Sequence, residues 1–142
     1  MRAVLDTNVV VSALLFGGTP LDIIDLAEAS AIELVASPAA LDELSRVLTR
    51  PRFTKWFSAR GLEPSAALTR YAELVTVIQA GDPPRVCRDA ADNEIIAAAV
   101  AGEADVIVSG DKDLLDCCNQ SPVPIVTAVE FLGICRQMLP HS

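Results

Sequence analysis

The chain has 142 residues, of which 51% are hydrophobic and 4% aromatic, and its 11 Lys and Arg against 19 Asp and Glu give a formal net charge of −8. We expect one domain over residues 1–142 with an α/β fold, because the core is aliphatic and strand-like runs alternate with helix-like ones. No apolar run approaches the roughly 18 residues of a membrane span, and the N-terminus enters a strand instead of a signal peptide, so we expect a cytoplasmic protein without a membrane partner.

The first third of the chain alternates strands with helices. Thr19 is the expected cap of the second helix, with Pro20 in its first turn, and Ser37-Pro38 repeats this signal before the third helix. In chain order we expect a strand at 2–5, a helix at 7–15, a break at 17–18, a helix at 21–30, a strand at 33–36 and a helix at 37–49.

Residues beyond 49 begin with a helical insert at about 50–84 and then return to the alternation. Asp89 or Asp92 opens an alanine-rich helix that ends at Gly102, and Thr127 with Glu130 forms a capping box for the last helix. We expect a helix at 64–73, a strand at 74–79, a loop at 81–84, the alanine-rich helix, strands at 105–109 and 123–126, and a helix at 127–138. Strands separated by helices predict parallel pairing through right-handed crossovers.

Cysteine and histidine offer little chemistry in this chain. Cys87, Cys117, Cys118 and Cys135 have no C-x-x-C spacing, and the single histidine, His141, lies beside the C-terminus. A zinc site needs thiolates and imidazoles at ligand spacing, and a Ser-His or Cys-His nucleophile needs a histidine held in a packed site. We therefore expect free thiols, and carboxylates remain as the candidates for chemistry.

One stretch is strongly basic although the chain as a whole is acidic. Between Glu43 and Glu63 no acid occurs, and the stretch carries five cations interleaved with Phe53, Trp56 and Phe57. Basic groups follow a phosphate backbone and aromatic faces stack on unpaired bases, so one interpretation is a docking surface for a single-stranded nucleic acid. The other is an amphipathic connector with packed aromatics and solvated cations. The candidate residues of the docking surface are Arg46, Arg50, Arg52, Lys55, Trp56 and Arg60.

Two acids follow predicted strands, and two lie on inward faces of predicted helices. Asp6 and Asp111 come after strand ends, where open parallel sheets place their ligand sites. At about 100° per residue, Glu43 borders the apolar stripe of its helix whereas Asp42 points away. Likewise, Asp92 shares a face with apolar residues, whereas Glu94 projects outward.

Several inward-facing carboxylates repel one another and raise each other's pKa values unless a cation lies between them. Either a metal ion or a set of arginines could supply that positive charge. Oxygen ligands suit Mg²⁺ or Mn²⁺, so one or two such ions are the metals that fit the pattern. Each acid also has a structural interpretation. Asp6 or Asp92 could be a helix cap, and Asp111 and Asp113 could be turn formers.

Four sequence blocks resemble the motifs of PIN-domain ribonucleases. They are LDTNVVVSALL at 5–15, LDEL at 41–44, DAADNEIIAAAV at 89–100 and ADVIVSGDKDLL at 104–115, and the resemblance extends over about residues 2–132. The first block and the insert most resemble the toxin components of toxin–antitoxin systems, relatives of the VapC toxins. The insert and the negative net charge depart from the compact, more basic members of that branch.

The resemblance implies a three-layer α/β/α fold around a mostly parallel sheet of four to five strands. It implies a Mg²⁺- or Mn²⁺-dependent endoribonuclease whose metal site is Asp6, Glu43, Asp92 and Asp111. It also implies an antitoxin partner and a homodimer. Outer-sphere candidates are Ser109, Asn8 (or Thr7), Asp113 and Asp89.

Three alternatives stay open at this point. An aspartate-nucleophile phosphatase would need a second acid where this chain has Asn8. A structure-specific DNA nuclease uses a related metal site. A regulatory PIN-fold binding module without turnover would have no reason to keep four converging acids.

Overall fold

A five-stranded, wholly parallel sheet forms the centre of the molecule, in the order β3-β2-β1-β4-β5. The computed structural model describes residues 1–117 and 119–138. In chain order the elements are β1 (Arg2–Leu5), α1 (Thr7–Phe16), α2 (Gly18–Glu28), β2 (Glu33–Ala36), α3 (Pro38–Leu48), α4 (Pro51–Ala59), α5 (Pro64–Leu74), β3 (Thr76–Val77), α6 (Ala90–Ala101), β4 (Val106–Val108), α7 (Lys112–Asp116), β5 (Ile125–Val126) and α8 (Ala128–Met138).

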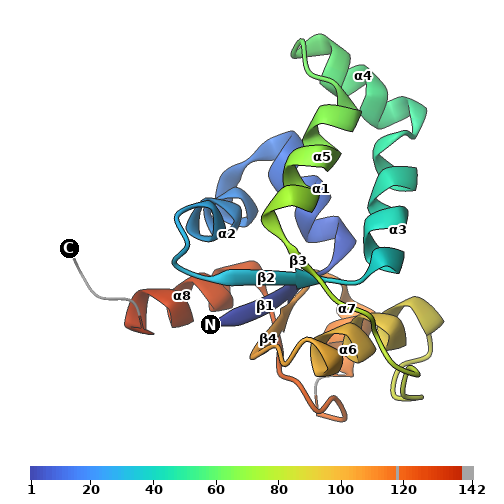
Figure 1. Cartoon of the computed structure of the whole chain (residues 1–142), viewed down its shortest axis with the longest axis vertical. Coiled ribbons are helices and arrows are strands. Elements are labelled where there is room, and N and C mark those ends of the chain that lie inside the picture. The colour runs from blue at the N-terminus through green and yellow to red at the C-terminus, as the bar shows by residue number, and fades with distance from the viewer. Residues whose placement is uncertain (118, 139–142) are drawn as a thin grey trace.

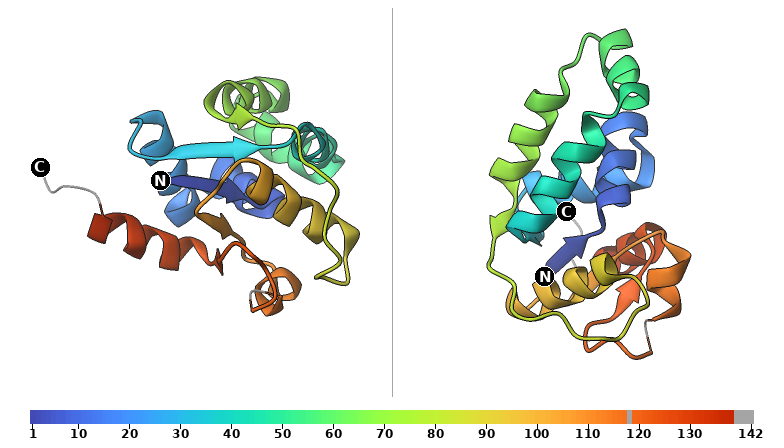
Figure 2. Two further views of the ribbon diagram at one scale, coloured as in Figure 1. Left: turned by 60° about the horizontal axis from the view of Figure 1, so that its bottom comes forward. Right: turned by 90° about the vertical axis from the view of Figure 1, so that its right-hand side faces the viewer.

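Helices cover both faces of the sheet, which gives the expected three layers (Figures 1 and 2). Alternate residues of β1 point to opposite faces: Ala3 and Leu5 join the core beneath α1, α2 and α8, whereas Val4 joins the core beneath α6 and α7. Because β1, β2 and β4 are buried on both faces over most of their length, they consist of nearly continuous apolar runs without alternation. The prediction of a three-layer α/β/α fold is confirmed.

Local signals located most element ends correctly. The Ser37 hydroxyl accepts a hydrogen bond from the Ala40 N–H (3.2 Å), as expected for the cap of α3. Thr127 and Glu130 form the predicted capping box, in which the Thr127 N–H donates to Glu130 Oε1 (3.0 Å) and the Glu130 N–H to Thr127 Oγ1 (3.2 Å). These side chains satisfy amide donors that the first turn of a helix leaves unpaired.

The second helix begins earlier than predicted. Its N-cap is Gly17, which has no side chain to cap with, so the prediction that Thr19 caps this helix is wrong. Gly17 and Gly18 adopt φ values of 72° and 67°, so the chain reverses there and the helix can start at Gly18. The break predicted at 17–18 is thus a tight corner between α1 and α2.

Gly102 ends α6 for a different reason from the one expected. Its φ is −86°, and Glu103 is the residue with positive φ (53°). A Cβ on Gly102 would lie 2.5 Å from Val35 Cγ1, so only glycine allows the end of α6 to approach β2 this closely. The glycine therefore serves helix–sheet packing.

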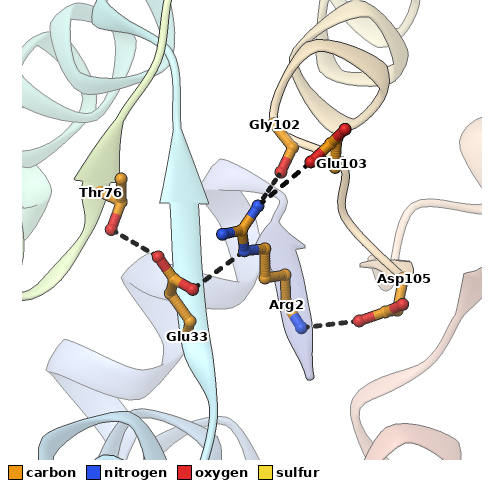
Figure 3. A network of polar contacts seen from close by, with 6 residues as sticks. All are labelled: Arg2, Glu33, Thr76, Gly102, Glu103 and Asp105. Atoms are coloured by element: carbon orange, nitrogen blue, oxygen red, sulfur yellow. Dashed lines mark hydrogen bonds and ion pairs between the residues drawn. The ribbon is translucent and has the colours of Figure 1, made fainter.

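A charged network joins the amino ends of the strands (Figure 3). Arg2 Nε donates to Glu33 Oε2 (2.9 Å), and the Thr76 hydroxyl donates to Glu33 Oε1 (2.9 Å). Arg2 also donates from its backbone N–H to Asp105 Oδ2 (2.8 Å) and from Nη1 to the Gly102 carbonyl (3.3 Å). Three strands and the end of α6 are thereby linked through one arginine.

Two further sequence predictions concern membranes and histidine. Within residues 1–117 and 119–138, no single helix is long and apolar enough to cross a membrane, although α1 and α2 together, bent by 98°, meet the length and composition test. His141 and Cys118 lie outside the described residues.

Candidate metal centre at the carboxyl end of the sheet

Asp6 and Asp111 meet at the carboxyl ends of β1 and β4. These strands pair in parallel with Leu5 opposite Val108, so Asp6 and Ser109 emerge side by side. The buried Ser109 hydroxyl donates to Asp6 Oδ2 (2.9 Å) and accepts from the Asp111 N–H (2.9 Å). Ser109 therefore fixes the Asp6 carboxylate relative to the loop that carries Asp111.

The Asp6 carboxylate is not used as a helix cap. Asp6 occupies the N-cap position of α1, but its side chain makes no capping hydrogen bond to that helix. The side chain is instead held by Ser109 and is 7% exposed. Its placement favours the site interpretation over the capping one.

Asp92 lies in the first turn of α6 and faces inward. It is 5% exposed, whereas Glu94 is exposed, as the helix periodicity predicted. Asp89, not Asp92, caps the helix: Asp89 Oδ1 accepts from the Ala91 N–H (2.9 Å). Asp92 Oδ2 is buried and has no hydrogen-bond partner among the described residues. A buried carboxylate oxygen of this kind is costly unless something positive binds it.

Glu43 approaches the same region from α3. It is half-buried, while Asp42 is exposed, again as predicted from the helix periodicity. Glu43 lines a cavity of about 20 Å³ together with Thr7, at the start of α1, and Ala91, in the first turn of α6. The α3 carboxylate thus lies beside the helix starts that carry Asp6 and Asp92.

The pKa values show that the four acids interact. Burial raises the pKa of Asp6, and repulsion from Asp111 and Glu43 adds to this rise, while the hydrogen bond from Ser109 opposes it. Burial also raises the pKa of Asp92 to about 6, and Asp111, Asp89, Asp6 and Asp113 raise it further by repulsion. The site therefore concentrates negative charge in a partly desolvated place.

The donor set fits a hard divalent cation in its chemistry. Within residues 1–117 and 119–138, no three or more His, Cys, Asp or Glu side chains lie close enough together, as they stand, to hold a metal ion. However, the unpartnered Asp92 oxygen and the mutual repulsion of the carboxylates are the two features that a bound Mg²⁺ or Mn²⁺ would relieve.

The outer candidates differ in what they contact. Ser109 joins Asp6 to Asp111, as described above. Asp89 caps α6, and Asp113 lies exposed in the first turn of α7, where its N–H donates to Asp111 Oδ1 (3.0 Å). Asn8 is exposed and lines a groove of about 570 Å³ that also includes Asp111 and Lys112.

Asn93 is a site-supporting residue that the sequence reasoning missed. Its Oδ1 accepts from the Val86 N–H (3.1 Å) and the Cys87 N–H (2.7 Å), and its Nδ2 donates to the Cys87 carbonyl (2.9 Å). The buried amide thus fastens the preceding loop to α6 directly beside Asp92. An amide within an otherwise aliphatic helix face was the available signal.

The Cys87 thiol lies near Asp92 but is not activated as a nucleophile. Cys87, Cys117 and Cys135 are free, as expected. Burial raises the pKa of Cys87 to about 12, and the nearby Cys117 and Asp92 also raise it. At neutral pH the Cys87 thiol is protonated and a poor nucleophile.

The basic stretch has packed phenylalanine rings and exposed cations. Phe57 is 1% exposed and Phe53 is half-buried, so these rings pack into the core. Trp56 remains 43% exposed. All five cations of this stretch are exposed: Arg46, Arg50, Arg52, Lys55 and Arg60.

The protein is an α/β domain in which carboxylates lie together at the carboxyl ends of parallel strands. The sequence model of the PIN domain matches residues 2–113, a range that contains all four acids. The chain therefore belongs to the PIN domain family, a family of nucleases.

Solved structures show the same fold at low sequence identity. A chain in the crystal structure of VapBC2 from Rickettsia felis, bound to a DNA fragment from their promoter, has a TM-score of 0.60 at 16% identity, covering 89% of this chain and 97% of that one. PAE2754 from Pyrobaculum aerophilum has a TM-score of 0.59 at 14% identity, covering 97% and 91%. No curated protein matches the sequence.

Proposed function

We propose that the protein is a Mg²⁺- or Mn²⁺-dependent endoribonuclease and the toxin of a type II toxin–antitoxin pair. The observation that carries the proposal is the buried Asp92 oxygen near Asp6 and Asp111, which has no hydrogen-bond partner in the described part of the chain, because a nuclease metal site needs such an oxygen-rich, negatively charged place. Membership of the PIN domain family supports the nuclease part.

In this proposal Asp6, Asp92 and Asp111 hold one or two ions, and Glu43 binds an ion or orients the attacking water. A bound ion would lower the pKa of a water molecule and stabilise the leaving oxygen of the phosphodiester. Ser109 positions the Asp6 carboxylate through its hydrogen bond of 2.9 Å. Asn93 positions Asp92 by fixing the start of α6.

An antitoxin is the proposed protein partner. Support comes from the likeness of the fold to a chain in the VapBC2 structure. The acidic centre would accept an Arg or Lys from such a partner in place of the metal, with an apolar helix docking beside it. A homodimer and a cytoplasmic location complete the proposal, and the free thiols of Cys87, Cys117 and Cys135 suit a reducing compartment.

A cleavage experiment with a mixed RNA pool tests this function. The protein is incubated with total RNA in Mn²⁺ or in EDTA, and the newly formed RNA ends are sequenced. We expect discrete cleavage sites that appear only with the metal. Competition with unlabelled RNA, hairpin DNA or flap DNA identifies the preferred substrate. Equal cleavage in EDTA would contradict the metal mechanism, and preferential competition by DNA would favour the DNA-nuclease alternative.

A further inference from the structure

An exposed aromatic pair lies at the far end of α1 and α3 from the acids. Phe16, the last residue of α1, and Trp56 of α4 are 62% and 43% exposed, and their rings meet edge to face with centroids 5.2 Å apart. The Arg60 guanidinium lies 4.6 Å from the centre of the Trp56 ring, and its Nη1 donates to the Trp56 carbonyl (3.3 Å). Arg60 therefore holds the indole in place.

Both helices that lead to this pair start near the metal centre. α1 begins immediately after Asp6, and α3 carries Glu43; α4 packs against both of them. Figure 1 shows α1 and α3 running side by side from the sheet toward α4. Ten residues of helix separate Asp6 from Phe16, a distance of about 15 Å at about 1.5 Å per residue. A stacked strand advances roughly 3.4 Å per nucleotide, so this distance corresponds to on the order of four nucleotides.

A groove beside α3 extends from Glu43 to the start of the basic stretch. It has a volume of about 370 Å³, and its lining includes Glu43 and Arg46, three residues apart on α3, and Arg50, the N-cap residue of α4. The acids of this groove are Asp42 and Glu43 of α3 and Glu94 of α6, and both α3 acids precede the two arginines in the chain. Arg46 and Arg50 thus lie on the side of the groove toward α4.

We propose that Phe16 and Trp56 form a base-stacking platform for an unpaired RNA strand, which reaches the metal centre along the groove lined by Arg46 and Arg50. The inference rests on the proposed ribonuclease function and adds a second contact with the substrate, remote from the cleaved bond. Base–aromatic stacking requires unpaired bases, so the platform selects single strands or loops over duplexes.

Charge favours a polyanion over a second copy of this chain on the surface. The stretch from Arg46 to Arg60 contains five of the 11 Lys and Arg residues and no acid. A two-fold dimer would place this same surface against itself and bring like charges together. A phosphate backbone would neutralise them instead.

The fluorescence of Trp56 tests the platform directly, because the chain contains a single tryptophan. The probe is a single-stranded oligouridylate of about 12 nucleotides, long enough to span both contacts, titrated in EDTA so that it is not cleaved. We expect saturable quenching by the single strand and much weaker quenching by an RNA duplex of equal length. Absent quenching, or equal quenching by the duplex, would overturn the proposal.

Variants separate the platform from other uses of this surface. Phe16→Ala should weaken binding of the single strand about fivefold or more. The double variant R46Q/R50Q should reduce the salt dependence of binding by about 1.4 in slope, because each lost phosphate contact removes about 0.7 for a single strand. Controls on α8, Arg136→Gln and Met138→Ala, remove an equally exposed cation or apolar side chain and should leave both quantities unchanged.

Two outcomes would distinguish competing accounts. If Phe16→Ala leaves RNA affinity unchanged but lowers the sedimentation coefficient of the RNA-free protein, the pair is a protein interface and the inference is wrong. If single strands quench Trp56 as expected but the wild-type protein never cleaves RNA in Mn²⁺, the platform stands and the proposed nuclease function fails.

Discussion

Carboxylates at the two ends of the parallel sheet have opposite environments and opposite pKa shifts. At the amino end, Glu33 accepts hydrogen bonds from Thr76 and Arg2, and these contacts lower its pKa. At the carboxyl end, Asp92 keeps a buried oxygen without a partner among the described residues, and its pKa rises to about 6. Acids that stabilise the fold have cations or donors nearby, so a buried carboxylate oxygen that lacks both, as Asp92 Oδ2 does among the described residues, indicates a place where a ligand supplies the charge.

The largest expected difference between the two ends is in RNA cleavage, when one acid at each end is neutralised. We expect Asp6→Asn to reduce Mn²⁺-dependent RNA cleavage by about 100-fold or more, because losing a preorganised charged group at a reaction centre typically costs this much. Asp111→Asn should behave similarly, with the helical circular dichroism of both variants unchanged. The matched control, Glu33→Gln, should retain activity. Undiminished cleavage by purified Asp6→Asn protein would reject the proposed centre.

Neutralising an acid of the metal centre should raise the stability of the metal-free protein, although it lowers activity. The pKa of Asp92 is higher in the folded state, so the unfolded state binds fewer protons between about pH 4 and pH 6, and stability falls as pH rises through this window. Asp92→Asn should therefore stabilise the EDTA-treated protein at neutral pH, by at most about 3 kcal/mol since one pKa unit corresponds to about 1.4 kcal/mol.

Glu33→Gln should have the opposite effect in the same denaturation series. The folded-state pKa of Glu33 is lowered, so its contribution is present above the unfolded pKa and is lost as pH falls. This variant should be slightly less stable at neutral pH. A destabilising Asp92→Asn substitution in EDTA would show that Asp92 is a satisfied structural acid, contrary to the comparison.

Removing the Ser109 hydroxyl should lower both the stability of the fold and the affinity for Mn²⁺, and these effects should be smaller than the loss of activity in Asp6→Asn. Ser109→Ala leaves the Asp6 carboxylate and the Asp111 N–H without their hydrogen bonds of 2.9 Å, at a cost of about 1–3 kcal/mol in unfolding free energy. Because groups that orient ligands typically change metal affinity 10- to 100-fold, Mn²⁺ binding should weaken by about this factor. Wild-type Mn²⁺ affinity in this variant would mean that Ser109 only packs.

Patterns in the sequence predicted much of the fold. The cap at Ser37 and the capping box at Thr127 follow from short-range chemistry, and parallel pairing follows from the alternation of strands and helices; the structure confirms all three. Strand limits were overestimated: 74–79 contains only Thr76–Val77, and 123–126 only Ile125–Val126, because sheet pairing and not local apolarity decides where a strand ends.

Helix α7 shows why turn signals were misleading. Gly110-Asp111 reads as a turn, and no helix was predicted after it. In the structure Asp111 Oδ1 accepts from the Asp113 N–H (3.0 Å) and starts a helix at Lys112. Aspartate is favoured both in turns and at helix N-caps, so the dipeptide alone does not distinguish them.

The candidate site was predictable where one helix face decided it. Periodicity alone separates buried Asp92 from exposed Glu94. Contacts between distant segments were not predictable, such as the Ser109–Asp6 hydrogen bond across 103 positions or the Phe16–Trp56 ring pair. These depend on how elements pack, which no local pattern contains.

Calorimetric titration of the metal-free protein with Mn²⁺ tests the central claim most directly. The account predicts saturable binding of one or two ions to the wild-type protein and to Glu33→Gln, and strongly weakened binding to Asp92→Asn. Absence of binding to the wild type, or equal binding to Asp92→Asn, would contradict a metal centre at the carboxyl end of the sheet.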